Sequence, residues 1–341
     1  SSLARIMRES FGGSDAGGAW SWRMAYDLMQ AATVTAIMRD SGSDALATAR
    51  LLASRLLTET RRSEEQIRLQ QFSTPLPYAA LAIRAAAIRP GETVLEPSAG
   101  TGALAGFAVC AGGKPMLNEI DPFRRALLEA VFGGEVSGFD AEHIDDLLTV
   151  PELPGVIVMN PPFASSVDRS RDKHIAAKHL IGAAKRLAPG GRLAAIMPMG
   201  FSPKRDAAHW ARASAIAKPR LALTIPGHVY RKLGTTVETQ LMVFDKVQEE
   251  IEIVRAMVDD LDAARQIIDD IAATRTATPS IQTGAQFRTG SRRVGVPVAR
   301  QRPIAQAASA KPKSHAAIPL AFTCLDTPRE NTPVSDIYAR Y

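Results

Sequence analysis

The sequence predicts an α/β fold with a doubly wound sheet, and three observations support this prediction. Strands and helices alternate from about residue 75 to residue 247. The apolar run at 94–96 leads through a glycine-containing turn into an apolar helix at about 103–109. Residues 236–244 alternate in polarity, as a final antiparallel strand does. In such a sheet, cofactor and substrate bind at the carboxyl ends of the strands.

Further strands fit between these landmarks. Residues 114–121 read as a second strand, and the segment before Gly138 as a third. The apolar run 156–159 reads as a strand that ends at a pair of prolines. Residues 192–197 follow a Pro-Gly-Gly turn and read as the fifth strand.

Helices and a tail are expected on either side of this region. Residues 18–39 and 43–60 show helical periodicity and form an N-terminal helical region at 1–62. Residues 249–275 read as one charged helix. Residues 276–341 read as a flexible basic tail or linker.

The net charge of +6 comes from this tail. Seven basic residues and no acidic one lie between residues 276 and 315, so the rest of the chain carries 6 − 7 = −1. A flexible basic segment can follow a nucleic-acid backbone, and it can equally be a solvated spacer. The seven are Arg288, Arg292, Arg293, Arg300, Arg302, Lys311 and Lys313.

Composition predicts a soluble cytoplasmic enzyme. The chain has 341 residues, 46% of them hydrophobic, and no apolar run near the ~20 residues that span a bilayer. We expect neither a signal peptide nor a membrane contact. Cys110 and Cys324 have no paired spacing, which argues against a disulfide or a zinc site. The six histidines are scattered, and none is predicted to bind a metal.

The segment Asn160-Pro161-Pro162-Phe163 carries the clearest chemical signal. Two prolines stiffen the backbone between an amide and an aromatic ring, which together make a clamp for a planar amine. The Asn160 side-chain oxygen and the Pro161 carbonyl could accept the two N–H bonds of an adenine amino group, and Phe163 could stack on an extruded base. The plainer interpretation is an ordinary strand exit.

A second candidate site lies upstream. Gly100 and Gly102 let the backbone approach a ligand closely, and the start of the following helix carries a partial positive charge. The segment lacks the Lys-Ser/Thr ending of a phosphate-binding loop. Glu96 suits a cationic ligand such as the amino group or sulfonium of S-adenosylmethionine.

Acidic residues follow the next two strands. Glu119 is predicted to accept hydrogen bonds from a ribose diol, with Asp121 as second choice. Asp140 could accept from an adenine amino group, with Phe139 beside the ring, or it could cap a helix at about 141–148.

These motifs resemble those of the N6-adenine DNA methyltransferases. Residues 71–75, Gln-Phe-Ser-Thr-Pro, look like the segment that lies over the methionine end of the cofactor in that family. Because this segment precedes the glycine turn and the clamp follows it, the order resembles the gamma arrangement. The resemblance covers roughly residues 63–247 and implies a Rossmann-like, seven-stranded class I methyltransferase sheet, with the methyltransferase domain at 63–248.

The resemblance also implies roles for individual residues. The catalytic ones are Asn160, Pro161, Pro162 and Phe163. S-Adenosyl-L-methionine is the implied cofactor, and the residues expected to contact it are Phe72, Thr74, Pro75, Glu96, Pro97, Ser98, Gly100, Gly102, Glu119, Ile120, Asp140 and Asn160.

A narrower resemblance connects the chain with bacterial strawberry-notch-like proteins, in which a methyltransferase region precedes a helicase. It rests on residues 20–26, 64–75 and 333–338. The chain contains no Walker A loop, so the helicase is expected to lie downstream in a longer parent protein. The start Ser1-Ser2 fits an internal boundary of such a protein, and a processed N-terminus would look the same.

The sequence thus predicts a methyltransferase acting on adenine N6 in single-stranded DNA, or in duplex DNA with a flipped adenine. Methylation of RNA or of a protein glutamine amide is an alternative, because those enzymes use similar clamps. The position of residues 71–75 favours DNA. A non-catalytic module that binds cofactor or DNA for the helicase is the other alternative.

Overall fold

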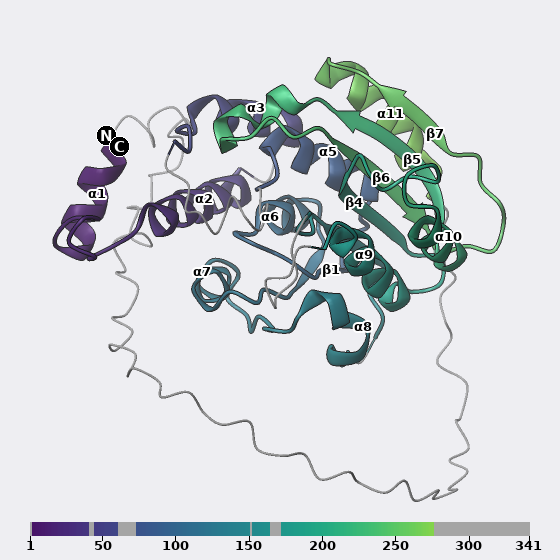
Figure 1. The fold of residues 1–341 in the computed structure, drawn as a ribbon, viewed down its shortest axis with the longest axis horizontal. Coiled ribbons are helices and arrows are strands. Elements are labelled where there is room, and N and C mark those ends of the chain that lie inside the picture. Colours follow the sequence, from purple (N-terminus) through teal and green to yellow (C-terminus); the bar gives the residue numbers. More distant parts are fainter. Residues whose placement is uncertain (1, 41–43, 61–72, 151, 164–171, 276–341) are drawn as a thin grey trace, which may run out of the picture. The chain divides into compact units, whose positions relative to one another are not determined.

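The computed structural model describes residues 2–40, 44–60, 73–150, 152–163 and 172–275 (Figure 1). The chain divides into two compact units. One unit contains the amphipathic helix α1 (Ser2–Phe11). The other spans Gly13–Thr278 and contains all other described elements. Among the described residues, no helix is both long and apolar enough to cross a membrane.

The second unit is built on a seven-stranded sheet of order β2-β1-β3-β4-β6-β5-β7. Neighbouring strands are parallel except that β6 is antiparallel to both β4 and β5. This confirms the predicted doubly wound fold and its antiparallel strand. The strands are β1 Thr93–Glu96, β2 Lys114–Leu117, β3 Val156–Met159, β4 Arg192–Pro198, β5 Lys218–Ile225, β6 Thr239–Asp245 and β7 Val254–Met257.

Helices cover both faces of the sheet (Figure 1). The chain moves from β1 to β2 in one direction and from β3 to β4 in the other, so right-handed crossovers place α6 and α9 on opposite faces. The helices of this unit are α2 Trp22–Arg39, α3 Ala45–Arg55, α5 Leu76–Ala86, α6 Ala103–Cys110, α7 Pro122–Phe132, α8 Ile144–Leu147, α9 Ile175–Arg186, α10 Ala207–Ile216 and α11 Leu261–Ala273, with 3₁₀ turns η1 Ala141–His143 and η2 Gly227–Leu233.

The sheet differs from the expected one at its two edges. The predicted third strand is reduced to a single parallel bridge between Asn118 and Ser137. The helix predicted at 249–275 is wrong in its first half, because Val254–Met257 forms β7 and extends the sheet beside β5. Asp260 then caps α11, its carboxylate accepting the amides of Asp262 and Ala263, so the helix begins only at Leu261.

The expected N-terminal helices pack in the same unit as the sheet. Helix α2 begins at its cap Ser21, whose hydroxyl accepts the Met24 amide, and it packs against α6 and α7. Helix α3 packs against α5. The rings of Trp22 and Tyr26 on α2 are in contact, with 5.7 Å between their centroids.

A buried ion pair at the amino-terminal end of β4 connects the sheet to helices α5 and α11. Arg192 on β4 is fully buried, and its guanidinium donates to both carboxylate oxygens of Asp245 on β6, at 2.6 and 2.9 Å. It also donates to the carbonyls of Ala85 and Ile271, which belong to α5 and α11. Arg220 on β5 is a second partner of Asp245.

Replacing Arg192 with Met is expected to destabilise the fold by about 3 kcal/mol or more, because it leaves a buried carboxylate and two buried carbonyls with fewer donors. Urea unfolding measures the change. The control is Arg212→Met on the exposed side of α10, which should stay within about 0.5 kcal/mol of wild type. Equal stability of the two variants would contradict the structural role of Arg192.

Candidate functional site

The three strands β2, β1 and β3 end side by side at the carboxyl edge of the sheet. Glu96 pairs with Leu117, and Leu95 pairs with Ile157. The chain leaves this edge toward residues 97–102, 118–121 and 160–163. The direction of the connections reverses between β1 and β3, and a doubly wound sheet binds ligands outside the strand ends at such a switch point.

The turn after β1 needs glycine at two positions. Gly100 has φ of 57° and Gly102 has φ of 89°, both in the left-handed region. A Cβ on Gly102 would also lie 2.8 Å from Phe132 and 2.9 Å from Leu128. Gly102 is the N-cap of α6, so the turn presents the start of that helix at the carboxyl edge.

Glu96 is buried beneath the turn. Its carboxylate accepts the Ala105 amide of α6 at 3.0 Å, and the residue is 3% exposed. Burial raises the pKa of Glu96 well above its usual range, the nearby Glu119 carboxylate adds to this rise, and the Ala105 amide opposes it. Glu96 thus fastens the turn to α6, a role that the sequence analysis did not foresee.

Glu119 lies at the end of β2 and holds the same turn. One carboxylate oxygen accepts the Gly100 amide at 2.7 Å, and the other accepts the Asp121 amide at 2.9 Å. Burial raises the pKa of Glu119, while the Arg124 guanidinium opposes that rise. Each carboxylate oxygen has a second acceptor position, so these bonds leave capacity for a further donor such as a hydroxyl.

Asn118, which the sequence analysis passed over, connects three segments of the edge. The residue is fully buried. Its amide nitrogen donates to the carbonyls of Pro97 and Phe139, both at 2.9 Å. Its side-chain oxygen accepts the Phe139 amide and the Ser137 hydroxyl at 2.9 and 2.8 Å. These bonds hold residues 137–139 beside β2, where the predicted third strand forms only one bridge.

Helix α2 anchors the β2 side of the edge with charged residues. Arg23 donates to the Asp121 carboxylate at 2.5 Å. Asp27 is 2% exposed and accepts both Nε and Nη2 of Arg124, the latter at 3.0 Å. Although burial opposes it, backbone amides and the Arg23 and Arg124 guanidiniums lower the pKa of Asp121. Asp121 also caps α7, so the acidic strand end is held from two directions.

Gln30 on the same helix anchors the β1 side. Its side-chain oxygen accepts the hydroxyls of Ser73 and Thr101 at 2.7 and 2.9 Å. Its amide nitrogen donates to Glu59 at 2.5 Å. Residues 23, 27 and 30 lie on one helical face, and all three bind the carboxyl edge or the segment beside it. In the sequence, these three residues are visible as polar residues at helical spacing among the aromatic residues of the same segment.

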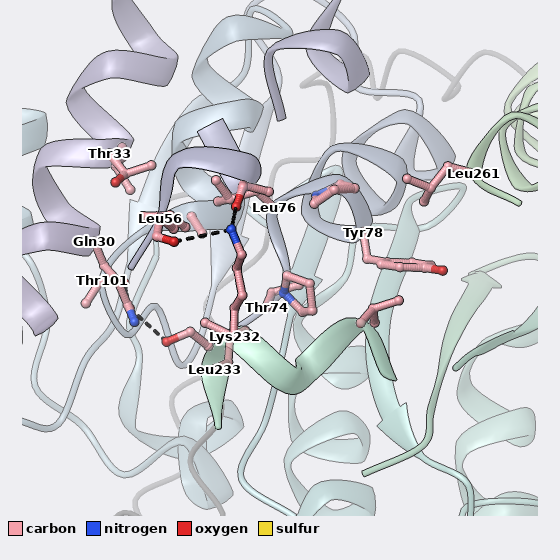
Figure 2. A pocket seen from close by; sticks show the side chains of 17 residues that line it. Gln30, Thr33, Leu56, Thr74, Leu76, Tyr78, Thr101, Lys232, Leu233 and Leu261 are labelled. Carbon is pink, nitrogen blue, oxygen red and sulfur yellow. Dashed lines mark hydrogen bonds between the residues drawn. The ribbon is translucent and has the colours of Figure 1, made fainter. Parts of the chain in front are cut away.

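A cavity of about 150 Å³ adjoins the glycine turn (Figure 2). Thr74 and Pro75 line it from one side, and Thr101 and Gln30 from another. Lys232 on η2 closes a further side and donates to the carbonyls of three residues at the end of α3. The remaining lining is largely apolar, so the cavity suits an apolar group with few polar contacts.

Asp140 caps the 3₁₀ turn η1, its carboxylate accepting the Glu142 amide at 2.9 Å. This bears out the capping alternative and leaves the adenine contact as a prediction. Two apolar side chains at the same edge are accessible: Ile120 is 40% exposed and Phe139 is 37% exposed. These exposed apolar groups provide surface for a planar ring.

The Asn-Pro-Pro-Phe segment follows β3 directly. Asn160 is half-buried, whereas Pro161 and Phe163 are buried. A base that stacked on Phe163 would have to replace the groups that now cover its ring. Residues 164–171, which follow the segment, lie outside the described residues, and so does Phe72.

Comparisons with known proteins give likenesses of fold alone. No family model and no curated protein matches the sequence. A putative RNA methyltransferase from Pyrococcus horikoshii is similar, with 20% identity, 59% of this chain and 96% of that chain covered, and a TM-score of 0.44. The N-methyltransferase NodS from Bradyrhizobium japonicum, in complex with S-adenosyl-L-homocysteine, has 12% identity, 60% and 99% coverage and a TM-score of 0.38. The M protein of the type I restriction enzyme EcoKI has 16% identity, 72% and 65% coverage and a TM-score of 0.40.

Replacing Asn118 with Ala is expected to lower the free energy of unfolding by about 3 kcal/mol, because four hydrogen bonds of roughly 0.5 to 1.5 kcal/mol each are lost in a buried place. Ser137→Ala removes one partner hydroxyl and should cost about 1 kcal/mol. Urea unfolding compares the two. Similar losses in both variants would argue against Asn118 as the connecting residue.

The raised pKa of Glu96 predicts a pH effect on stability. The folded state keeps its proton more tightly than the unfolded state, so the contribution of Glu96 is greatest below its ordinary pKa and is lost as pH rises through the raised value. Glu96→Gln keeps an acceptor for Ala105 and has no charge. The difference in unfolding free energy, variant minus wild type, should therefore increase from pH 4 to pH 7.5, and a constant difference would contradict the raised pKa.

Proposed function

We propose that the chain is an S-adenosylmethionine-dependent methyltransferase that acts on the N6 amino group of adenine in DNA. One observation carries this proposal. The Asn160–Phe163 segment leaves β3 beside the glycine turn of β1, at the switch point where a doubly wound sheet binds its ligands. A rigid amide and aromatic clamp therefore lies next to a backbone turn suited to a nucleotide-like cofactor.

The surroundings of the turn support S-adenosyl-L-methionine as the cofactor. The Glu119 carboxylate has acceptor capacity for a ribose diol, and the accessible side chains of Ile120 and Phe139 offer apolar surface for an adenine ring. Thr74 and Pro75 line the adjoining cavity, consistent with the methionine end. Pro97, Ser98 and Asp140 are proposed as further contacts on the same grounds as in the sequence analysis.

The proposed reaction proceeds by orientation. The Asn160 side-chain oxygen and the Pro161 carbonyl accept the two N–H bonds of the adenine amino group and return electron density to its nitrogen. The nitrogen lone pair forms the new N–C bond while the C–S bond of the sulfonium breaks, leaving a neutral thioether. The methylated amine then loses a proton to solvent. No covalent enzyme intermediate is involved, and the rate depends on in-line alignment.

DNA as substrate rests on the residues 71–75 that precede the glycine turn and on the basic segment 276–315, which could bind a phosphate backbone. Both lie partly or wholly outside the described residues. RNA or a protein glutamine amide would use the same clamp. A helicase region in a longer parent protein, as in the strawberry-notch-like proteins, would supply the substrate strand and is likewise a proposal.

The decisive experiment offers labelled S-adenosylmethionine with single-stranded DNA, duplex DNA, RNA and protein, followed by nucleoside and peptide mass analysis. Label in N6-methyladenine from DNA supports the proposal. Label in RNA or in glutamine would support methyl transfer by the same clamp, with RNA or protein in place of DNA as the substrate. Cofactor binding without transfer to any of the four would favour the non-catalytic module.

Asn160→Ala is expected to bind S-adenosylmethionine with nearly wild-type affinity and to lower kcat by about 100-fold or more, because the lost acceptor acts mainly in the transition state. Calorimetry measures binding, and label transfer measures the rate. Gln266→Ala removes another amide from the exposed surface of α11 and serves as the control. Full activity of Asn160→Ala would exclude the clamp.

A further inference from the structure

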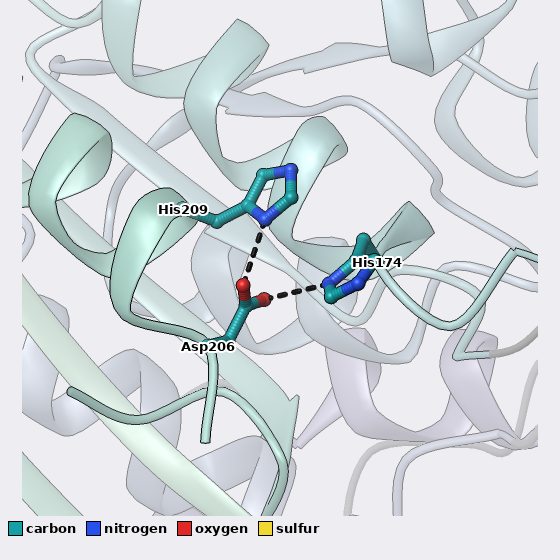
Figure 3. Close-up of side chains that lie close together, drawn as sticks. All are labelled: His174, Asp206 and His209. Atoms are coloured by element: carbon teal, nitrogen blue, oxygen red, sulfur yellow. Dashed lines mark hydrogen bonds and ion pairs between the residues drawn. The ribbon is translucent and has the colours of Figure 1, made fainter. Parts of the chain in front are cut away.

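Three side chains away from the glycine turn converge on one point (Figure 3). His174 lies just before α9, Asp206 just before α10, and His209 in the first turn of α10. The Nδ1 atom of His174 is 3.0 Å from one oxygen of Asp206, and the Nδ1 atom of His209 is 2.8 Å from the other. The two loops leave the carboxyl ends of neighbouring strands, β3 and β4.

The position of Asp206 shows that this arrangement is specific. Aspartate at an N-cap usually accepts an amide of the helix that it precedes. Asp206 is the N-cap of α10 but makes no side-chain cap bond. Both of its oxygens are bonded to imidazoles instead, and its side chain is only 10% exposed.

The two imidazoles are held as a pair. Their rings stack at 4.7 Å between centroids with 22° between planes. Their side chains are 32% and 17% exposed for His174 and His209. An ionised carboxylate can only accept, so each Nδ1 carries a proton in this arrangement. Although burial opposes it, the hydrogen bonds from His209 and His174 lower the pKa of Asp206, which keeps the carboxylate ionised at neutral pH.

We propose that His174, Asp206 and His209 bind a divalent transition-metal ion of the zinc class. Candidate ligand atoms of all three lie within 4.8 Å of one another. Two imidazole nitrogens and one carboxylate oxygen suit Zn²⁺, Co²⁺ or Ni²⁺, whereas Mg²⁺ and Ca²⁺ prefer oxygen ligands alone. This differs from the sequence analysis, in which no histidine was expected to bind a metal.

Small movements would complete the site. Tetrahedral coordination with bonds of about 2.0 to 2.1 Å separates neighbouring ligand atoms by roughly 3.3 Å. The observed distances are 3.0 Å from His174 Nδ1 to one oxygen of Asp206 and 2.8 Å from His209 Nδ1 to the other oxygen, shorter by a few tenths of an ångström. The carboxylate would also turn to offer one oxygen to the ion. To bind the ion, each Nδ1 would present its lone pair in place of its proton, with Nε2 carrying the ring proton, and water would supply the fourth ligand.

A second group, Asp140, Glu142 and His143, is a weaker candidate. Asp140 caps η1, and Glu142 is paired with Lys178 at 3.0 Å, so a cation already faces its carboxylate. His143 is exposed. This group therefore provides a control within the same chain.

The ion would fix the connection after β3. Residues 160–163 leave that strand and His174 precedes the next helix, so a metal bound to α10 would hold the far end of the segment that includes the clamp. The proposal concerns metal binding and stands independently of methyl transfer.

The test measures metal binding by the full chain after chelator treatment. Calorimetry with ZnCl₂ and the visible spectrum with CoCl₂ are recorded for wild type, His174→Gln and His209→Gln. Glutamine can still donate to Asp206, which favours retention of the fold. The controls are His143→Gln and His228→Gln, the latter an exposed residue on η2. MgCl₂ serves as the control ion.

We expect one Zn²⁺ per chain, a loss of affinity of about 100-fold or more in His174→Gln and His209→Gln, and wild-type affinity in both controls. MgCl₂ should give no binding heat. Zinc affinity that persists in both His174→Gln and His209→Gln, or that is lost in His143→Gln, would overturn the assignment. The absence of zinc binding would also overturn it. Asp206 would then serve only to position the two imidazoles by hydrogen bonds.

A measurement on wild type alone covers the case in which the variants do not fold. Zn²⁺ should protect His174 and His209 from diethyl pyrocarbonate, as mapped by peptide mass analysis, and leave His228 reactive. Equal reactivity of all three with and without Zn²⁺ would also overturn the proposal.

Discussion

The carboxyl edge of the sheet depends on one buried amide, that of Asn118. Its main-chain oxygen accepts the Ala99 amide, and its side chain bonds to Pro97, Ser137 and Phe139. A third strand would normally hold this region through a ladder of backbone bonds. Here the Asn118 side chain, which has two donors and two acceptor positions, makes bonds in place of that ladder. The glycine turn and the accessible Phe139 therefore have fixed positions relative to β2.

The charges at this edge follow from burial and from groups on helices α2 and α7. Burial raises the pKa values of Glu96 and Glu119, whereas amides and the guanidiniums of Arg23 and Arg124 lower that of Asp121. Of these three carboxyls, Glu96 and Glu119 beneath the turn are therefore the two whose ionisation is most costly. A cation bound above them would favour their charged forms, so its binding would release protons at pH values below the raised pKa.

The sequence predicted the parts of this site that are local. A strand, a turn with two glycines and a helix follow directly from residues 94–110, and the capping alternative for Asp140 came from its place before a short helical segment. Contacts that depend on distant residues were not accessible in this way. Asn118 reads as one more polar residue at a strand end, and Gln30 lies 43 and 71 positions from its partners Ser73 and Thr101. The split of 249–275 into a strand and a helix depended on the unpaired edge of β5, which no local pattern records.

The proposed catalysis by orientation requires that the segment after β3 be held in place. Val156–Met159 fixes its start, because the strand is fully buried and paired with β1 and β4. Its far end reaches His174, which the Asp206 carboxylate ties to the loop after β4. A hydrogen bond between imidazole and carboxylate at a partly exposed place contributes little, whereas metal coordination would be much stronger and directional. In the proposed metal-bound form, the same three residues would therefore hold His174 more firmly than the hydrogen bonds alone do.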